Sequence, residues 1–265
     1  TNSTGSYNTY LGYDTDCASN NLMNSTAIGY SASITKSDQI VLGKTTTPPE
    51  VYIPGNLVTN IDATINTLTV GSGSGNVTSN TVIGKTAFGS NTTGFFNVAI
   101  GINALHSNDT AYQNVAIGGA ALYSNTIGNL NIGIGHMALY TNIEGDNNVA
   151  MGFKALYSAT GSSNQAIGWL ALINTSTGNG NAAIGYNAGS SNTSGSNNLY
   201  LGYNANANAN NYSNSTAIGT NSTITKSDQI VLGKTTTPPE VYIPGNVGIG
   251  TTTPFSSLDV VGTDA

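Results

Sequence analysis

The chain has 265 residues, of which 38% are hydrophobic and only 7% are charged, against about 25% in an average domain. Its formal charge of −6 and its six scattered lysines argue against nucleic acid as a partner, and no apolar run approaches the roughly 18 residues of a membrane helix. One cysteine, Cys17, excludes an intrachain disulfide framework and offers no metal cluster.

Residues 1–56 read as the end of a first repetitive head. Gly12 and Gly29 are 17 residues apart, and the next step, to Gly43, shortens to 14. The prolines in 48–54 cannot donate ladder hydrogen bonds, so we expect a terminator of strand stacking there. Because the chain opens inside the repeat pattern, we also expect it to be a piece of something longer.

Residues 57–79 break the period and are interpreted as a connector. Their Thr, Val and Ile content favours an extended stalk. The glycine-rich stretch GSGSG at 71–75 does not lead into a helix, so it indicates a flexible joint and not a phosphate loop.

Residues 80–246 contain the main array, in which the pentapeptide NVAIG at 97–101 recurs with small changes. Each copy ends in glycine, and successive glycines are 17 residues apart, except for one step of 16 into Gly168. Ala-Leu follows three residues later, and a polar turn completes the unit. A unit of this length suits one coil of a β-solenoid, with asparagines forming a ladder along one corner. The alternative, a low-complexity linker, does not explain apolar positions that keep phase.

The strand of each coil is apolar on both faces. In 98–100, Val and Ile point to one face of the strand and Ala points to the other. Strands that are buried on both faces have continuously apolar sequences of this kind. We expect Val and Ile to face the interior and the small residue to lie close to another chain. A wider monomeric solenoid is the alternative. The predicted repeat-core positions are Val98, Ala99, Ile100, Gly101, Val115, Ala116, Ile117, Gly118, Ile134, Gly135, Met151, Gly152, Ile167, Gly168, Ile184 and Gly185.

The ending of the array is a duplicate. Residues 34–56 recur letter for letter at 224–246, so the second head closes with the same terminator as the first. Residues 247–265 read as the start of another connector. The sequence therefore predicts heads and connectors in series.

These repeats resemble the head repeats of trimeric autotransporter adhesins, the SVAIG…A class. They are more similar to the NVAIG..AL.SNT.G.N arrays in fibre proteins of phages and large DNA viruses, over about 80–250 and 6–43. The segment at 247–262 resembles one that commonly lies upstream of the self-cleaving chaperone of phage tail fibres. The resemblance implies a left-handed parallel β-roll, an intertwined parallel homotrimer and an extracellular location on the virion surface. The coil is longer than that of the autotransporter heads and there is no clear neck motif, which favours the viral family.

The sequence contains no recognisable convergent catalytic set, metal site or cofactor site. Glu144 with Asp146, and Asp14 with Asp16, share turns that suit weak cation binding or plain solvation. His106 occupies a tyrosine position of the repeat, and no nucleophile accompanies His136. The aromatic residues that follow the corner glycines have two interpretations, a glycan-stacking stripe or packing between coils; they are Phe153, Trp169, Tyr186 and Tyr203.

The sequence thus predicts an all-β, repetitive β-solenoid that is not an enzyme. Its expected function is that of a structural fibre segment, a rigid spacer with a host-attachment surface. Its expected partners are further copies of itself and a host receptor, with a glycan among the candidates. The alternatives are a bacterial trimeric surface adhesin at the cell surface and a polysaccharide depolymerase.

Overall fold

The computed structural model describes residues 4–43, 63–65, 68–234, 247–249 and 258–260. The proline-rich terminators and the first residues of the predicted connector lie outside these ranges. The chain divides into two compact units, Thr1–Val58 and Thr59–Ala265. Each unit is a parallel β-solenoid whose coils are about 17 residues apart.

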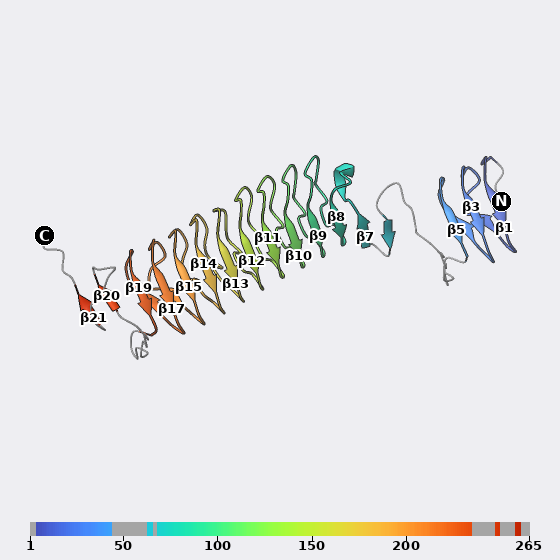
Figure 1. Ribbon diagram of the computed structural model, residues 1–265. Coiled ribbons are helices and arrows are strands. Elements are labelled where there is room, and N and C mark those ends of the chain that lie inside the picture. The colour runs from blue at the N-terminus through green and yellow to red at the C-terminus, as the bar shows by residue number, and fades with distance from the viewer. Residues whose placement is uncertain (1–3, 44–62, 66–67, 235–246, 250–257, 261–265) are drawn as a thin grey trace. The chain divides into compact units, whose positions relative to one another are not determined.

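Unit 2 contains a ladder of ten short parallel strands that run side by side in Figure 1. Equivalent residues of successive coils pair in register, as Val115 does with Val98 and with Ile132. The strands are β8 (Thr81–Ile83), β9 (Val98–Ile100), β10 (Val115–Ile117), β11 (Ile132–Ile134), β12 (Val149–Met151), β13 (Gln165–Ile167), β14 (Ala182–Ile184), β15 (Leu199–Leu201), β17 (Thr216–Ile218) and β19 (Ile230–Leu232).

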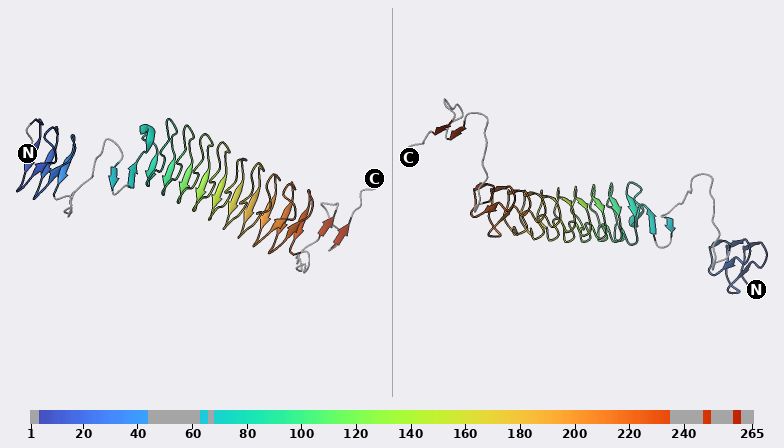
Figure 2. Two further views of the ribbon diagram at one scale, coloured as in Figure 1. Left: turned by 180° about the vertical axis from the view of Figure 1, so that it is seen from behind. Right: turned by 90° about the horizontal axis from the view of Figure 1, so that it is seen from below.

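Sharp corners at fixed positions close each coil. Gly101 has a φ of 127°, and a Cβ there would lie 2.7 Å from the carbonyl of Gly118, so this corner requires glycine. Three further corners of the coil use non-glycine residues in the left-handed region, at Asn103, Leu105 and Gln113. The chain therefore turns back to start the next coil one strand spacing further on, which is the stacking that both views of Figure 2 show.

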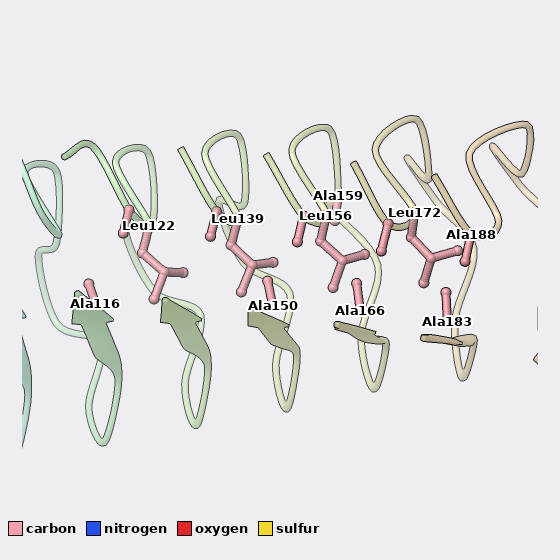
Figure 3. Packing of buried hydrophobic residues seen from close by; sticks show 14 of the residues in the cluster. Ala116, Leu122, Leu139, Ala150, Leu156, Ala159, Ala166, Leu172, Ala183 and Ala188 are labelled. Atoms are coloured by element: carbon pink, nitrogen blue, oxygen red, sulfur yellow. The ribbon is translucent and has the colours of Figure 1, made fainter. Parts of the chain in front are cut away.

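The interior of unit 2 is a thin layer between the sheet and the opposite side of each coil. In Figure 3, leucines such as Leu122 and Leu139 point toward the strands, and the strand alanines, including Ala116 and Ala150, point toward them. All four side chains are fully buried. A repeating Leu–Ala contact thus fills the core.

The predicted orientation of the strands is therefore wrong. Ala99 is fully buried inside the coil, whereas Val98 and Ile100 lie on the outer face of the sheet and are only partly covered. The physical reason is the width of the coil. The leucine of the opposite segment already occupies the interior, so the strand position that faces it has room only for a small side chain. A Cβ added at Gly133 would lie 3.3 Å from Cγ of Leu122.

Buried asparagines join the coils, as predicted, and form two ladders instead of one. In the first ladder, the backbone N–H of Asn114 donates to Oδ1 of Asn97 at 2.9 Å, and its Nδ2 donates to the carbonyl of Gly128. Equivalent bonds run from Asn80 to Ser215 at 2.8–3.0 Å. A second, shorter series on the turn side includes a bond from Nδ2 of Asn108 to Asn91. The side chains thus satisfy corner amides that the sheet leaves unpaired.

The N-terminal end of the roll is closed by residues that the sequence assigns to the connector. Strands β6 (Ala63–Ile65) and β7 (Leu68–Gly71) form an antiparallel hairpin, and β7 pairs antiparallel with β8. A single 3-10 turn, η1 (Ser74–Asn76), follows. The stretch GSGSG is not a free joint, because Gly73 lies against Phe88, where a Cβ would come within 3.1 Å of the ring.

The C-terminal end of unit 2 and the whole of unit 1 share one plan. In unit 1, β1 (Thr9–Leu11), β3 (Thr26–Ile28) and β5 (Ile40–Leu42) form a parallel sheet, with β2 (Asp16–Cys17) and β4 (Ser33–Ile34) on the other side. In unit 2, β16 (Asn206–Ala207) and β18 (Thr223–Ile224) are the counterparts of β2 and β4. Two further strands, β20 (Val247–Ile249) and β21 (Leu258–Val260), pair in parallel.

Candidate interaction surfaces

The outer face of the unit 2 sheet carries an uninterrupted apolar column, here called the outer column. It contains one residue from each of the ten parallel strands, and these residues pair in register. Several of these side chains are 36–48% exposed; among them Ile117 is the least exposed and Leu232 the most exposed. With strands about 4.8 Å apart, the column is roughly 43 Å long. Its members are Ile83, Ile100, Ile117, Ile134, Met151, Ile167, Ile184, Leu201, Ile218 and Leu232.

A parallel column beside it begins at Thr81 and Val98 and contains no charged residue. The two columns together make one uncharged and mostly apolar face along the roll, interrupted in the second column by Thr81, Gln165 and Thr216. Contiguous apolar surfaces of this kind mark interaction sites, because isolated proteins rarely expose them to water.

The aromatic residues after the corner glycines form ring stacks along the roll. The ring centroids of Phe153 and Trp169 are 4.3 Å apart, those of His136 and Phe153 are 5.6 Å apart, and those of Tyr186 and Tyr203 are 5.2 Å apart. The two faces of Phe153 are thus occupied by its neighbours. For Phe153 this geometry favours the packing interpretation, because sugar stacking needs an open ring face, whereas Trp169, Tyr186 and Tyr203 each have one stacked neighbour and are 45–52% exposed.

A second ring stack joins His106, Tyr123, Tyr140 and Tyr157, with centroids 4.9–5.2 Å apart. Its first member occupies the tyrosine position of the repeat, as the sequence predicts. Nζ of Lys154 lies 5.2 Å from the ring centroid of Tyr157 and 5.4 Å from that of Phe153, so one ammonium group contacts both stacks.

Most of the candidate cation-binding acids make local hydrogen bonds. Oδ1 of Asp146 accepts from the backbone N–H of Asn129 at 2.6 Å, and Oδ1 of Asp16 accepts from that of Cys17 at 2.8 Å. Asp14 accepts from the hydroxyl of Ser31 at 3.2 Å. Within the described ranges, no group of three or more His, Cys, Asp or Glu side chains is arranged to hold a metal ion.

A polar notch opens between the turns of three successive coils. It has a volume of about 380 Å³, and the side chain of Glu144 stands at its edge. The sequence gives one sign of this site, the single glycine step of 16 residues, but not its shape. The remaining lining residues are Gly145, Thr160, Gly161, Ser162, Thr177 and Asn179.

No protein-family model matches this chain, and no curated protein matches it. Among the helices of the described residues, none has the length and apolar character needed to cross a membrane.

Proposed function

We propose that the chain is a segment of a homotrimeric fibre, in which three parallel copies pack the outer column of each roll against one another. The single observation that carries the proposal is the outer column, an apolar stripe along ten strands that the described residues of the chain leave partly exposed. Burial of such a surface is the main favourable contribution to association.

The repeat spacing supports another copy of the same chain as the occupant of this face. Only a surface with the same strand spacing can match the column residue by residue over its whole length. Copies that run in parallel achieve this without like-charge repulsion, since neither column is charged. The shortened coil does not disturb the match, because Val149 still pairs with Gln165 in register. Closed symmetric homo-oligomers are also the commonest form of protein assembly.

The number three, the left-handed winding and the fibre role rest on the resemblance to the heads of viral and phage fibres. In this role the two rolls are rigid spacers in series, displayed outside the cell on a virion, and the turns that differ from coil to coil provide the surface for host attachment. The duplicated ending supports the serial plan, because Thr35 with Gln39 and Thr225 with Gln229 make the same capping bond at 3.0 and 2.8 Å.

Light scattering of the purified chain tests the assembly. We expect a mass of about three times 26.9 kDa. The double variant Ile117→Lys with Ile134→Lys places two charges in the outer column and should yield monomers with an unchanged β circular-dichroism spectrum. Ile127→Lys is the matched control, because Ile127 is 49% exposed but lies in a polar turn away from the sheet. A monomeric wild-type chain, or a double variant that stays trimeric, would refute the proposal.

A further inference from the structure

The notch arises from one missing residue in the turn of a single coil. Neighbouring coils have Thr126-Ile127-Gly128 and Ile143-Glu144-Gly145 in this turn, whereas the next coil has only Thr160-Gly161. The strands on either side of the deletion remain in register, so the whole loss of chain falls on the outer turn. The turn of the short coil is therefore one residue shorter than the turns beside it, and the notch lies at this turn.

The deletion also interrupts the hydrogen bonds between turns. The backbone N–H groups of 126–128 all donate to the carbonyl of Ile143, at 3.0–3.3 Å. For the amides of Ile143, Glu144 and Gly145, no acceptor among the described residues meets the geometry of a hydrogen bond. The amide of Gly145 resembles those of Gly178 and Gly195 in later coils, which are also buried without an acceptor in the described part of the chain, so the donors that the deletion leaves unpaired are those of Ile143 and Glu144. Glu144 and Gly145 line the notch, so it contains unpaired donors.

The side chains at the notch supply the complementary acceptors and one more donor. The carboxylate of Glu144 is exposed and makes no hydrogen bond or ion pair within the described part of the chain. Oδ1 of Asn179 accepts from the backbone N–H of Ser162 at 2.7 Å and its Nδ2 donates to the carbonyl of Thr177 at 3.1 Å, which leaves one amide hydrogen free. No Lys or aromatic side chain lines the notch.

The donors and acceptors of the notch indicate which chemical class of ligand it can bind. The carboxylate and the absence of a cation disfavour phosphates, sulfates and acidic sugars. The unpaired N–H groups disfavour a metal ion, because their partial positive charge points the wrong way. A neutral ligand with both donors and acceptors fits, and the volume lies at the lower end of the range of about 300–1,000 Å³ for ligand sites.

We propose that the notch binds one neutral acetamido sugar, with the carbonyl of its acetamido group on the amides of Glu144 and Gly145 and its ring hydroxyls on the carboxylate of Glu144. The proposal rests on the attachment role in the proposed function and names the class of receptor group at one site. One such site per chain would repeat around the fibre, so weak individual contacts would add through multivalency.

Titration calorimetry and saturation-transfer NMR on the full chain test this site. The probes are the methyl glycosides of N-acetylglucosamine and N-acetylgalactosamine, of glucose and galactose, and free N-acetylneuraminic acid. We expect one of the two acetamido glycosides to bind saturably, one per chain, with a Kd on the order of 1 mM. The sugars without the acetamido group should bind about tenfold more weakly, and the anionic sugar should not bind.

Two variants link binding to the notch. Insertion of one isoleucine between Thr160 and Gly161 restores the turn of the coil at 126–128, fills the notch and should abolish binding without changing the circular-dichroism spectrum. Glu144→Gln should weaken binding about tenfold, because hydrogen bonds to charged groups are the stronger ones. Thr110→Gln, at the same turn position of a full-length coil, is the matched control and should bind like the wild type.

The outcomes separate this site from the fibre itself. Absence of saturable binding by both acetamido glycosides would overturn the site, as would full binding by the insertion variant. Light scattering of the same sample reports the trimer independently. A trimer that binds no sugar would support the fibre proposal and refute the sugar site. A monomer that binds the sugar would support the sugar site and refute the fibre proposal.

Discussion

The backbone N–H of Asn148 donates a hydrogen bond of 2.9 Å to the side-chain oxygen of Asn131 in the preceding coil. Asn148 repeats the arrangement one coil further on, since its own oxygen accepts from the N–H of Asn164 at 2.9 Å. Its Nδ2 donates to the carbonyl of Gly161 at 2.9 Å. One side chain therefore connects two coils and closes its own turn.

Replacement of Asn148 by Ala should lower the free energy of unfolding by about 2–5 kcal/mol, because it leaves a buried amide and a buried carbonyl without partners. Urea denaturation measures the change. Asn147→Gly is the control, since Asn147 is exposed and has a φ of 58°, a conformation that glycine adopts freely. If the two variants lose the same stability, the ladder is not what holds the coils together.

The inward direction of the strand alanines predicts the effect of a larger side chain. Ala150→Leu should destabilise the roll by about 1–3 kcal/mol or more, because the interior is already filled by buried leucines. Met151→Leu, one residue away on the outer face, should change stability by less than about 0.5 kcal/mol in a monomeric background such as the two-lysine variant. Tolerance of leucine at position 150 would contradict the thin core.

The corner glycines should not accept alanine. Gly152 has a φ of 138°, and a Cβ there would lie 2.4 Å from the carbonyl oxygen of Gly168, so the backbone of two coils would have to separate. Gly152→Ala should cost more than about 2 kcal/mol in thermal or urea unfolding. Gly119→Ala is the control, because the nearest atom to its Cβ is the end of the His136 ring at 3.3 Å.

Tyr200 predicts a dependence of stability on alkaline pH. The side chain is fully buried where other coils have Ala, and its hydroxyl has no hydrogen-bond partner among the described residues. Burial raises the pKa of this phenol well above its ordinary value of about 10. Above that pH the unfolded chain releases the proton while the folded chain keeps it, so stability falls as the pH rises.

Tyr200→Phe removes both effects. It should raise the free energy of unfolding by about 1 kcal/mol at pH 7, because a buried hydroxyl without a partner is lost, and it should reduce the further loss of stability between pH 10 and 12. Urea denaturation at the two ends of that range measures the difference. Tyr203→Phe is the control, since Tyr203 is 52% exposed. Lower stability of the phenylalanine variant at both pH values would show that the hydroxyl has a favourable contact.

The ring stacks show which part of the aromatic packing could be predicted from residue type and spacing alone. The spacing of Phe153 and Trp169 places both rings on one line along the roll, and this much follows from the sequence. The sequence does not give the orientation of the rings, because a side chain on a stacked coil can lie flat on its neighbour or point away from it. The separation of 4.3 Å resolves this choice for the pair.

The sequence by itself determined the period of the solenoid, the glycine corners, the first asparagine ladder and the shortened coil. In a stacked roll, equivalent residues recur at a fixed interval along the chain, so each of these features is visible in the spacing of identical residues. These features depend on local conformation and on contacts between equivalent residues, which periodicity reports directly.

Only the tertiary structure decided which face of the strand is the core. Alternation shows that Ala99 and Ile100 point in opposite directions, but both are apolar, so no sequence rule says which one is inside. The leucine of the opposite segment decides, because it leaves room only for a small side chain; the larger Tyr200 lies where the opposite segment has Gly189 in place of leucine. The same three-dimensional context closes the roll with the β6–β7 hairpin and turns one missing residue into a notch. Both depend on how segments distant in the chain fill the space between them.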